Sequence, residues 1–224
     1  MHEGSQALLL LTDGRLPAGG YAHSGGLESA IRLGLVQDLE DLERFLIGRA
    51  TTICTVAAAF AAASCRGCLD DDLDRVMALD DEFRARTPTP ALRKVSLSLG
   101  RQLLRAWSAI RPHELQERLP PRLHHPVAFG ATAAMLELSP LDAARGMVHE
   151  TLTGPAMAAV KLMSIDPFAA HRIVSGLLPL LDRIATEAAA SASAPPDELP
   201  SHAAPLTDIV AEHHEAQGMR LFAS

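Results

Sequence analysis

The feature that most constrains this chain is a long run of apolar residues after Asp38, spaced by alternating steps of three and four. That spacing places them on one face of an α-helix, which repeats about every 3.6 residues. Asp38 is a favoured helix N-cap, and Gly67 is expected just past the helix end. A helix with one apolar face needs neighbours with apolar faces of their own, so we expect packed helices. The face consists of Leu39, Leu42, Leu46, Ala50, Ile53, Ala57 and Phe60.

Later segments repeat the helical pattern. A second, shorter stripe consists of Leu73, Val76, Leu79 and Phe83. Three further helices are predicted where a capping residue precedes proline, a residue suited to the first helical position: Thr89-Pro90, Ser139-Pro140 and Asp166-Pro167. A short helix is expected over 127–138, and Gly154-Pro155 should kink or break the helix that starts at Pro140. No segment alternates with a period of two, so no sheet is expected.

Small side chains make up much of the apolar content. Hydrophobic residues are 48% of the chain but aromatic residues only 4%, and alanine is abundant. Alanine is the best helix former, and its small side chain lets helices approach closely. The predicted fold class is therefore all-α, a single-domain helical bundle over residues 1–190.

Residues 191–205 depart from this pattern, because they place Pro195, Pro196, Pro200 and Pro205 among alanine and serine. This composition is typical of an extended, poorly ordered connector, which we expect to be the most mobile internal segment. Residues 206–224 should then form a short helix over 207–216 and a C-terminal tail. Apolar residues at the tail's end are expected to dock on this protein or on another.

Charge and composition exclude several classes of protein. The net charge of −7 argues against nucleic acid as a partner, since phosphate binding needs clustered basic charge. The first 14 residues lack the basic region of a signal peptide, and Leu8 to Leu11 is too short for its apolar core. The longest apolar stretch, 53–63, contains Cys54 and Thr55 and is not expected to span a bilayer. Three cysteines do not make a disulfide framework. These features predict a cytoplasmic protein with no membrane partner.

No arrangement of residues predicts catalysis, a bound cofactor or a tight metal site. Cys65 and Cys68 form a C-x-x-C at the expected end of a helix, where the electrostatics do not favour a thiolate. The adjacent pairs His124-His125 and His213-His214 do not have the spacing that gathers ligands on one helix face. A transient or interfacial metal site stays open. The sequence thus predicts a protein that is not an enzyme.

The densest motif is the segment from Leu16 to Glu28, which we call the signature segment. Read from its residues alone it is a tight turn, with Ser24 placed to cap a helix over 25–33. Its pattern, Leu-Pro-x-Gly-Gly, an aromatic residue, then Ser-x-Gly-Leu-Glu, resembles the N-terminal signature of UreF-type urease accessory proteins. Three later elements resemble the same family: Arg93 to Leu104, His125-Pro126-Val127 with Gly130, and His214-Glu215-x-Gln217 with Arg220-Leu221-Phe222-x-Ser224.

Two departures indicate a divergent branch of that family. Ala22-His23 stands where relatives have Ser-Tyr, and the segment 161–167 lacks the family's Pro-Leu-Gly-Gln element. Whether the region from Lys161 to His171 still engages a GTPase is left open.

The resemblance implies a helical, homodimeric scaffold that binds a UreD/UreH-type accessory protein and the GTPase UreG, and acts on apo-urease so that nickel reaches its active site. Nickel would be handled by the complex, not held as a cofactor by this chain. Exposed apolar residues on loops and tails mark interfaces, although they could also dock on their own core. The expected partner-binding residues are Tyr21, Ser24, Glu28, Glu215, Arg220, Leu221 and Phe222.

The sequence is also compatible with two other functions. The chain could activate the GTPase by inserting an arginine finger, with Arg220 as the candidate. It could instead be an enzyme that uses Cys65 and Cys68 or a histidine-rich metal site.

Overall fold

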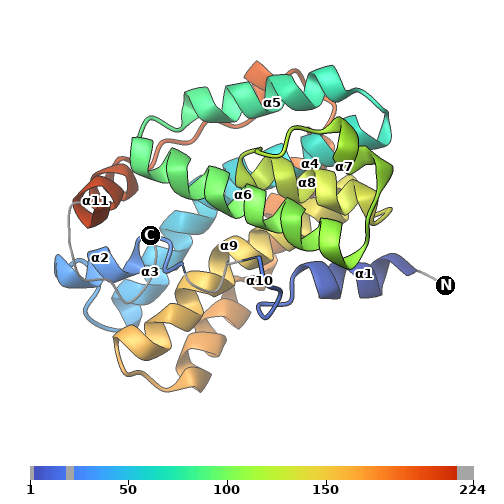
Figure 1. Cartoon of the computed structure of the whole chain (residues 1–224). Coiled ribbons are helices and arrows are strands. Elements are labelled where there is room, and N and C mark those ends of the chain that lie inside the picture. The colour runs from blue at the N-terminus through green and yellow to red at the C-terminus, as the bar shows by residue number, and fades with distance from the viewer. Residues whose placement is uncertain (1–2, 19–22, 216–224) are drawn as a thin grey trace.

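The computed structural model describes residues 3–18 and 23–215, and within them it contains helices and loops but no strand (Figure 1). The all-α prediction is therefore confirmed. The helices are α1 (Glu3–Leu11), α2 (Leu27–Arg32), α3 (Leu39–Arg49), α4 (Thr55–Leu69), α5 (Leu73–Arg86), α6 (Pro90–Ile110), α7 (Glu114–Arg118), α8 (His125–Met135), α9 (Pro140–Leu162), α10 (Pro167–Ala190) and α11 (Pro205–Glu215). A π-helical turn, Ala50–Cys54, joins α3 to α4, and a 3-10 turn, Pro196–Glu198, lies in the connector.

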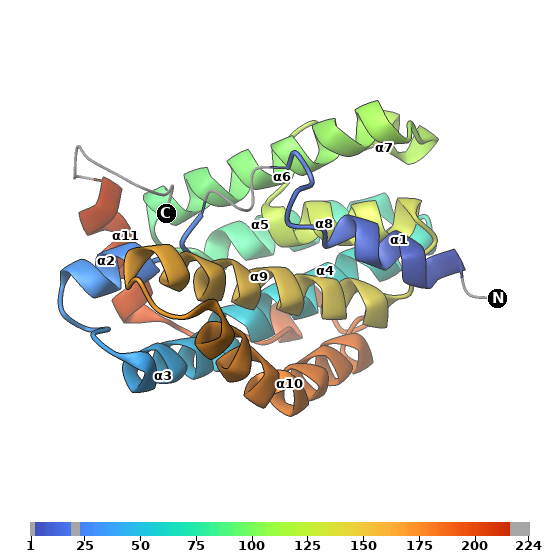
Figure 2. The same ribbon diagram turned by 90° about the horizontal axis from the view of Figure 1, so that it is seen from below.

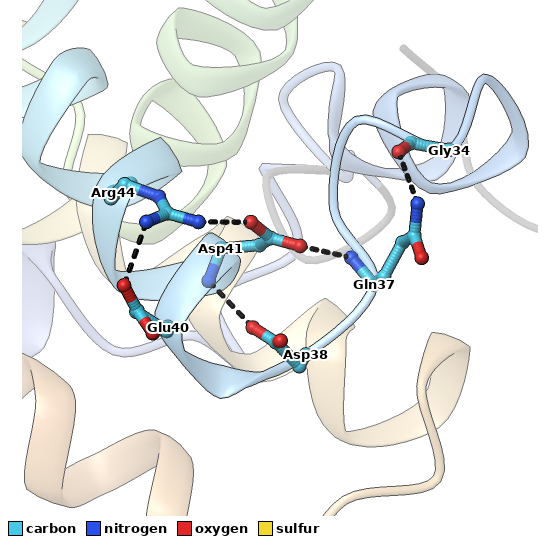
Figure 3. Close-up of polar contacts among 6 residues, drawn as sticks. All are labelled: Gly34, Gln37, Asp38, Glu40, Asp41 and Arg44. Atoms are coloured by element: carbon cyan, nitrogen blue, oxygen red, sulfur yellow. Dashed lines mark hydrogen bonds and ion pairs between the residues drawn. The ribbon is translucent and has the colours of Figure 1, made fainter.

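The predicted long helix begins as expected. The Asp38 carboxylate accepts a hydrogen bond from the backbone N–H of Asp41 at 2.9 Å, which caps α3 (Figure 3). The expected role of Gly67 is wrong, because Gly67 lies inside α4. The helix ends at Leu69, and Asp71 takes the left-handed conformation, with φ 59°. At Gly67 a side chain would crowd α5, since an added Cβ would lie 3.0 Å from Cγ2 of Val76.

The core is built around α4. This helix packs against α5, α8, α9 and α10, and its residues 58–63 are fully buried. Figure 2 shows α6 and α10 on opposite sides of the layer that contains α4, α8 and α9. The run Leu39–Leu69 is long and apolar enough to cross a membrane by length and composition. Its apolar character is accounted for by the four helices that surround α4.

Helices α4 and α8 approach closely because small residues face each other. A Cβ added to Gly130 of α8 would lie 2.2 Å from the carbonyl oxygen of Ala61 and 2.9 Å from the backbone nitrogen of Cys65. The hydroxyl of Ser64 donates to the carbonyl of Val127 at 2.8 Å, across the same contact. The alanine and glycine content thus sets the distance between the two helix backbones.

The predicted starts of α9 and α10 are confirmed. Ser139 forms a capping box with Asp142, and the Asp166 carboxylate accepts from the N–H of Phe168 at 3.0 Å. The break expected at Gly154-Pro155 does not occur, because α9 continues through Pro155 to Leu162.

The connector is not loosely held, and this corrects the expectation of a poorly ordered segment. It runs beside α5 (Figure 1), from which two arginines reach it. Arg75 donates to the carbonyls of Ala192 and Ala194. Arg86 donates to four more carbonyls, those of Pro196, Asp197, Leu199 and Pro200, at 2.6 to 3.0 Å. Leu199 is buried. The connector is a series of turns, and the six carbonyls that the two arginines bind face α5.

Candidate functional site

Segments that carry the sequence motifs meet at one cavity of about 350 Å³. It lies between the signature segment, the α3–α4 junction, α6, the start of α8 and the chain around α11. Its walls are mostly apolar. Residues from the motif-bearing segments that line it are Gly25, Gly26, Val95, Ser96, Leu99, His125, Pro126, Thr207, Asp208 and Ala211.

The signature segment enters the cavity wall through two glycines with positive φ, Gly25 at 59° and Gly26 at 89°. Side chains rarely adopt this left-handed conformation. The turn leads into α2, which is shorter than the expected 25–33 helix. The expectation that Ser24 caps this helix is wrong, because Gly26 is the N-cap residue of α2 and no side chain caps it. The Ser24 hydroxyl accepts only a long hydrogen bond, from the N–H of Glu28 at 3.4 Å.

Ser24 and Glu28, two of the expected partner-binding residues, have buried side chains. Glu28 forms an ion pair with Arg32 at 2.6 Å, one turn later in α2. In this conformation neither side chain offers surface to a partner, so any part they take in binding is exerted through the shape of the turn.

Arg49, at the end of α3, holds the turn in place. Its Nη1 donates to the carbonyl of Gly25 at 2.9 Å, and its Nε donates to the carbonyl of Thr151 at 3.0 Å. That second carbonyl lies four residues before Pro155, which has no N–H to offer it. Arg49 therefore satisfies a backbone group that the proline leaves unpaired and ties it to the signature segment. Burial lowers the pKa of Arg49.

We expect Arg49→Met to loosen the signature segment. The variant keeps the length of the side chain but leaves the carbonyls of Gly25 and Thr151 without a donor, which should lower the free energy of unfolding by about 1–3 kcal/mol. Amide hydrogen exchange should rise most in α2. Arg44→Met is the matched control, because Arg44 lies on the same helix with 63% of its side chain exposed. Equal protection of α2 in both variants would contradict the assigned role.

The last described helix closes the opposite side of the cavity. The hydroxyl of Thr89 donates to the Asp208 carboxylate, and the N–H of Ala91 donates to Glu212 at 3.2 Å. Two carboxylates of α11 thus lie at the N-terminus of α6, where the helix dipole favours negative charge. Thr89 precedes α6 as predicted, but its hydroxyl bonds to α11 and does not cap its own helix.

The other five expected partner-binding residues have side chains outside the described part of the structure. Tyr21, Arg220, Leu221 and Phe222 lie outside the described residues. Glu215 is the last residue of α11, and its side chain lies outside the described part of the structure.

The two adjacent histidines have different surroundings. His125 lines the cavity. Its backbone N–H donates to the Ser96 hydroxyl at 3.0 Å, and its ring Nε2 lies 3.3 Å from the Glu150 carboxylate. His124 is only 1% exposed, and its Nδ1 has no partner in the described structure. The backbone N–H of His124 donates to the Asp80 carboxylate at 2.6 Å, and the centre of its ring lies 5.3 Å from that of the Phe83 ring. Burial, together with the positive charges of Arg84 and Arg93, lowers the pKa of His124 to about 4.

This burial predicts a loss of stability in mild acid. The pKa of His124 is lower in the folded protein than in the unfolded chain, where it is near the ordinary value of about 6.5. Its contribution is therefore present above pH 6.5 and is lost as the pH falls toward 4, at a cost that reaches about 3 kcal/mol. Comparing the pH dependence of urea unfolding with that of His124→Leu isolates this contribution. Burial of His149 acts in the same direction, and the raised pKa of Asp80 opposes it. Identical slopes for the two proteins between pH 6.5 and 4 would refute the prediction.

The three cysteines have the properties of core side chains. Cys54, Cys65 and Cys68 are buried free thiols, and burial raises the pKa of each to about 12. A reactive thiol has a lowered pKa and an accessible sulfur. Within the described residues, no group of three or more His, Cys, Asp or Glu side chains is arranged to hold a metal ion. As far as the described residues show, the site is a mostly apolar cavity, and the three thiols are not placed to act in it.

Arg49 and Arg86 are the residues of this region that sequence reasoning missed. Arg49 contacts residues 24 and 102 positions away, and Arg86 contacts residues 110 to 114 positions away. For Arg49 the sequence offered one signal, which is Pro155 inside a helical pattern. A proline has no N–H, so the carbonyl four residues earlier needs a hydrogen-bond donor from elsewhere in the chain.

Comparisons with known proteins identify the same family as the motifs. The family model described as UreF matches residues 36–178 of this chain. The chain is 42% identical over 217 residues to the urease accessory protein UreF of Mycobacterium sp. (strain JLS), covering 97% of both proteins. It is 40% identical over 218 residues to that of Mycobacterium bovis (strain BCG / Pasteur 1173P2), and 39% identical over 217 residues to that of Mycolicibacterium vanbaalenii, again covering 97% of each protein.

Proposed function

Because this chain belongs to the UreF family of urease accessory proteins, we propose that it assists nickel insertion into apo-urease as a scaffold that joins a UreD/UreH-type protein to the GTPase UreG. It is an accessory protein and not an enzyme, and it works with other urease accessory proteins. We further propose that it acts in the cytoplasm as a homodimer within that complex. Nickel is the cargo of the complex in this proposal and is not a resident cofactor of the chain.

The observation that carries the proposal is the convergence of the motif-bearing segments on one cavity. The signature segment, α6, the start of α8 and α11 come from distant parts of the chain and line the same space. Large apolar cavities lined by a few polar groups are typical of binding sites. The charged groups in its walls make structural contacts: Arg49 and Arg86 bind backbone carbonyls, and Asp208 binds Thr89. Such a site supports recognition of another protein and does not require catalysis by this chain.

The test is complementation of a urease-positive host from which the resident UreF gene has been deleted. Expression of this chain should restore urease activity and the nickel content of purified urease. A protein that is folded and abundant but restores neither would refute the proposal. Pull-downs from the same cells should recover the UreD/UreH-type protein and UreG.

A truncated form tests the expected role of the C-terminal tail. Deleting residues 218–224 removes Arg220, Leu221 and Phe222. Burial of one large apolar side chain is worth about 1.5–3 kcal/mol, so loss of the tail should weaken binding to the UreD/UreH-type protein by about tenfold or more. Unchanged affinity together with a lowered melting temperature would mean that the tail docks on its own core.

A further inference from the structure

The guanidinium of Arg49 lacks a counter-ion among the residues that the structure describes. Its Nε and Nη1 bind the carbonyls of Thr151 and Gly25, and its Nη2 donates to no group of the described chain. Among the ion pairs of those residues, none includes Arg49. Burial lowers the pKa of Arg49, and the group that opposes this shift is the Cys54 thiol, whose own pKa of about 12 keeps it neutral. The positive charge is therefore not compensated by the described chain.

Arg86 lines the same cavity and shows how the protein accommodates a similar group. It also donates to backbone carbonyls, but it has Glu82 as an ion-pair partner at 2.7 Å. Burying a charge costs free energy unless an opposite charge and hydrogen bonds compensate it. An anion beside Arg49 would supply what Glu82 supplies to Arg86.

Open space adjoins Arg49. The cavity of about 350 Å³ and a second hollow of about 430 Å³ share four lining residues, which are Gly26, Arg49, Ala204 and Thr207. The two spaces therefore meet beside the guanidinium, and each lies within the size range of small-molecule sites. The hydroxyl of Thr207 donates to no group of the described residues, so it is a second donor available at this place.

The cavity walls limit the chemical class of the anion. Side chains that line the cavity near the α3–α4 junction and along α6 are aliphatic: Ile53, Val56, Ala57, Leu92, Val95 and Leu99. The carboxylate that lines the cavity, that of Asp208, already accepts from Thr89. One cation in apolar surroundings matches a ligand with one negative charge and an apolar body, because a second negative charge would be buried without a partner.

We propose that this cavity binds a small organic monoanion, a carboxylate with an aliphatic body. Its carboxylate accepts from Nη2 of Arg49 and from the hydroxyl of Thr207, and its body packs against Val95 and Leu99 of α6. Hydrogen bonds between a guanidinium and a carboxylate are charge-assisted and therefore strong. The ligand joins α3, α6 and α11, and it adds to the proposed function a binding property of the chain by itself.

The test follows methyl NMR resonances of the purified full chain during titration with hexanoate. We expect a dissociation constant of about 1 mM or lower. Resonances of Ile53 and Val95 should shift, and those of the exposed Leu178 on α10 should not. Hexanamide, which lacks the charge, and acetate, which lacks the aliphatic body, should each bind at least about tenfold more weakly. At about ten times the dissociation constant, hexanoate should raise the melting temperature by about 3 °C or more.

Two variants test the two parts of the site. Arg49→Met removes the cation and should weaken hexanoate binding by at least about tenfold. Because it also removes two structural hydrogen bonds, Val95→Phe serves as the second variant: it fills the cavity, keeps Arg49 and should weaken binding by a similar factor with an unchanged circular dichroism spectrum. Arg84→Met is the matched control, since Arg84 is 64% exposed on α5, and it should bind hexanoate as the wild type does.

Several results would overturn the inference. They are a dissociation constant for hexanoate above about 10 mM, equal affinity for hexanamide or acetate, full affinity in either Arg49→Met or Val95→Phe, and equal weakening by Arg84→Met. Each is measured on this chain without partner proteins. Failure of the inference would therefore leave the complementation and pull-down results unaffected, and failure of those would leave the ligand site standing.

Discussion

Gly130→Ala is expected to lower the free energy of unfolding by at least about 3 kcal/mol, at the top of the range for overpacking. The added methyl would lie 2.2 Å from the carbonyl oxygen of Ala61 and 2.9 Å from the nitrogen of Cys65. Both are backbone atoms of α4, so relief requires that two core helices separate. Separation would also stretch the hydrogen bond from Ser64 to Val127. Because native domains are stable by about 5–15 kcal/mol, the loss is a large fraction of the total.

Gly48→Ala is the matched control for this prediction. Gly48 lies within α3, and an added Cβ would meet no heavy atom within 4 Å. Alanine is preferred to glycine in helices, so this variant should be more stable by up to about 1 kcal/mol. Chemical unfolding followed by circular dichroism measures both variants. Destabilisation of Gly130→Ala by less than about 1 kcal/mol would show that the α4–α8 contact relaxes easily.

The second large effect is expected for Arg86→Met, because one guanidinium holds most of the connector. Arg86 donates to four connector carbonyls, pairs with Glu82 at 2.7 Å, and lies 5.3 Å from the centre of the Phe60 ring. Its side chain is 11% exposed. Methionine can keep part of the packing but none of the hydrogen bonds. We expect a loss of about 2–4 kcal/mol, together with rapid proteolysis between residues 191 and 205.

Arg84→Met tests whether the effect belongs to that one arginine. Arg84 lies on the same helix and pairs with Asp81 at 3.0 Å, with the two side chains 64% and 71% exposed. Such surface pairs contribute less than about 1 kcal/mol, so both stability and protease resistance should stay near wild type. If Arg86→Met left residues 191–205 as resistant to protease as they are in the control, the connector would be held by other contacts.

Local chemistry was predictable from the sequence. The caps at Asp38, Ser139 and Asp166 were found because each side chain meets a backbone N–H only two or three residues away. The period of the apolar residues likewise fixed the helical class, since it depends on the helix alone. The signature segment and α6 were recognised as important, and both line the cavity.

Contacts between distant residues were not predictable. The connector reads as a loose linker because proline, alanine and serine lack the side chains that would hold it. The groups that hold it are Arg75 and Arg86 on α5, more than 100 positions earlier. From the sequence, Gly67 looks like a residue just past a helix end. In the structure it lies within α4, where a larger side chain would crowd Val76 of α5. In each case the decisive partner belongs to another element.

The central position of α4 has a consequence for how the protein is made. Its packing partners α8, α9 and α10 lie between residues 125 and 190, so they are synthesised well after α4 itself. At about 5–20 residues per second, a ribosome needs several seconds to add them. During that interval the nascent chain carries the run Leu39–Leu69, which is long and apolar enough to cross a membrane by length and composition. We therefore expect nascent chains that end before α8 to expose this apolar surface and to be prone to aggregate until α8, α9 and α10 cover it.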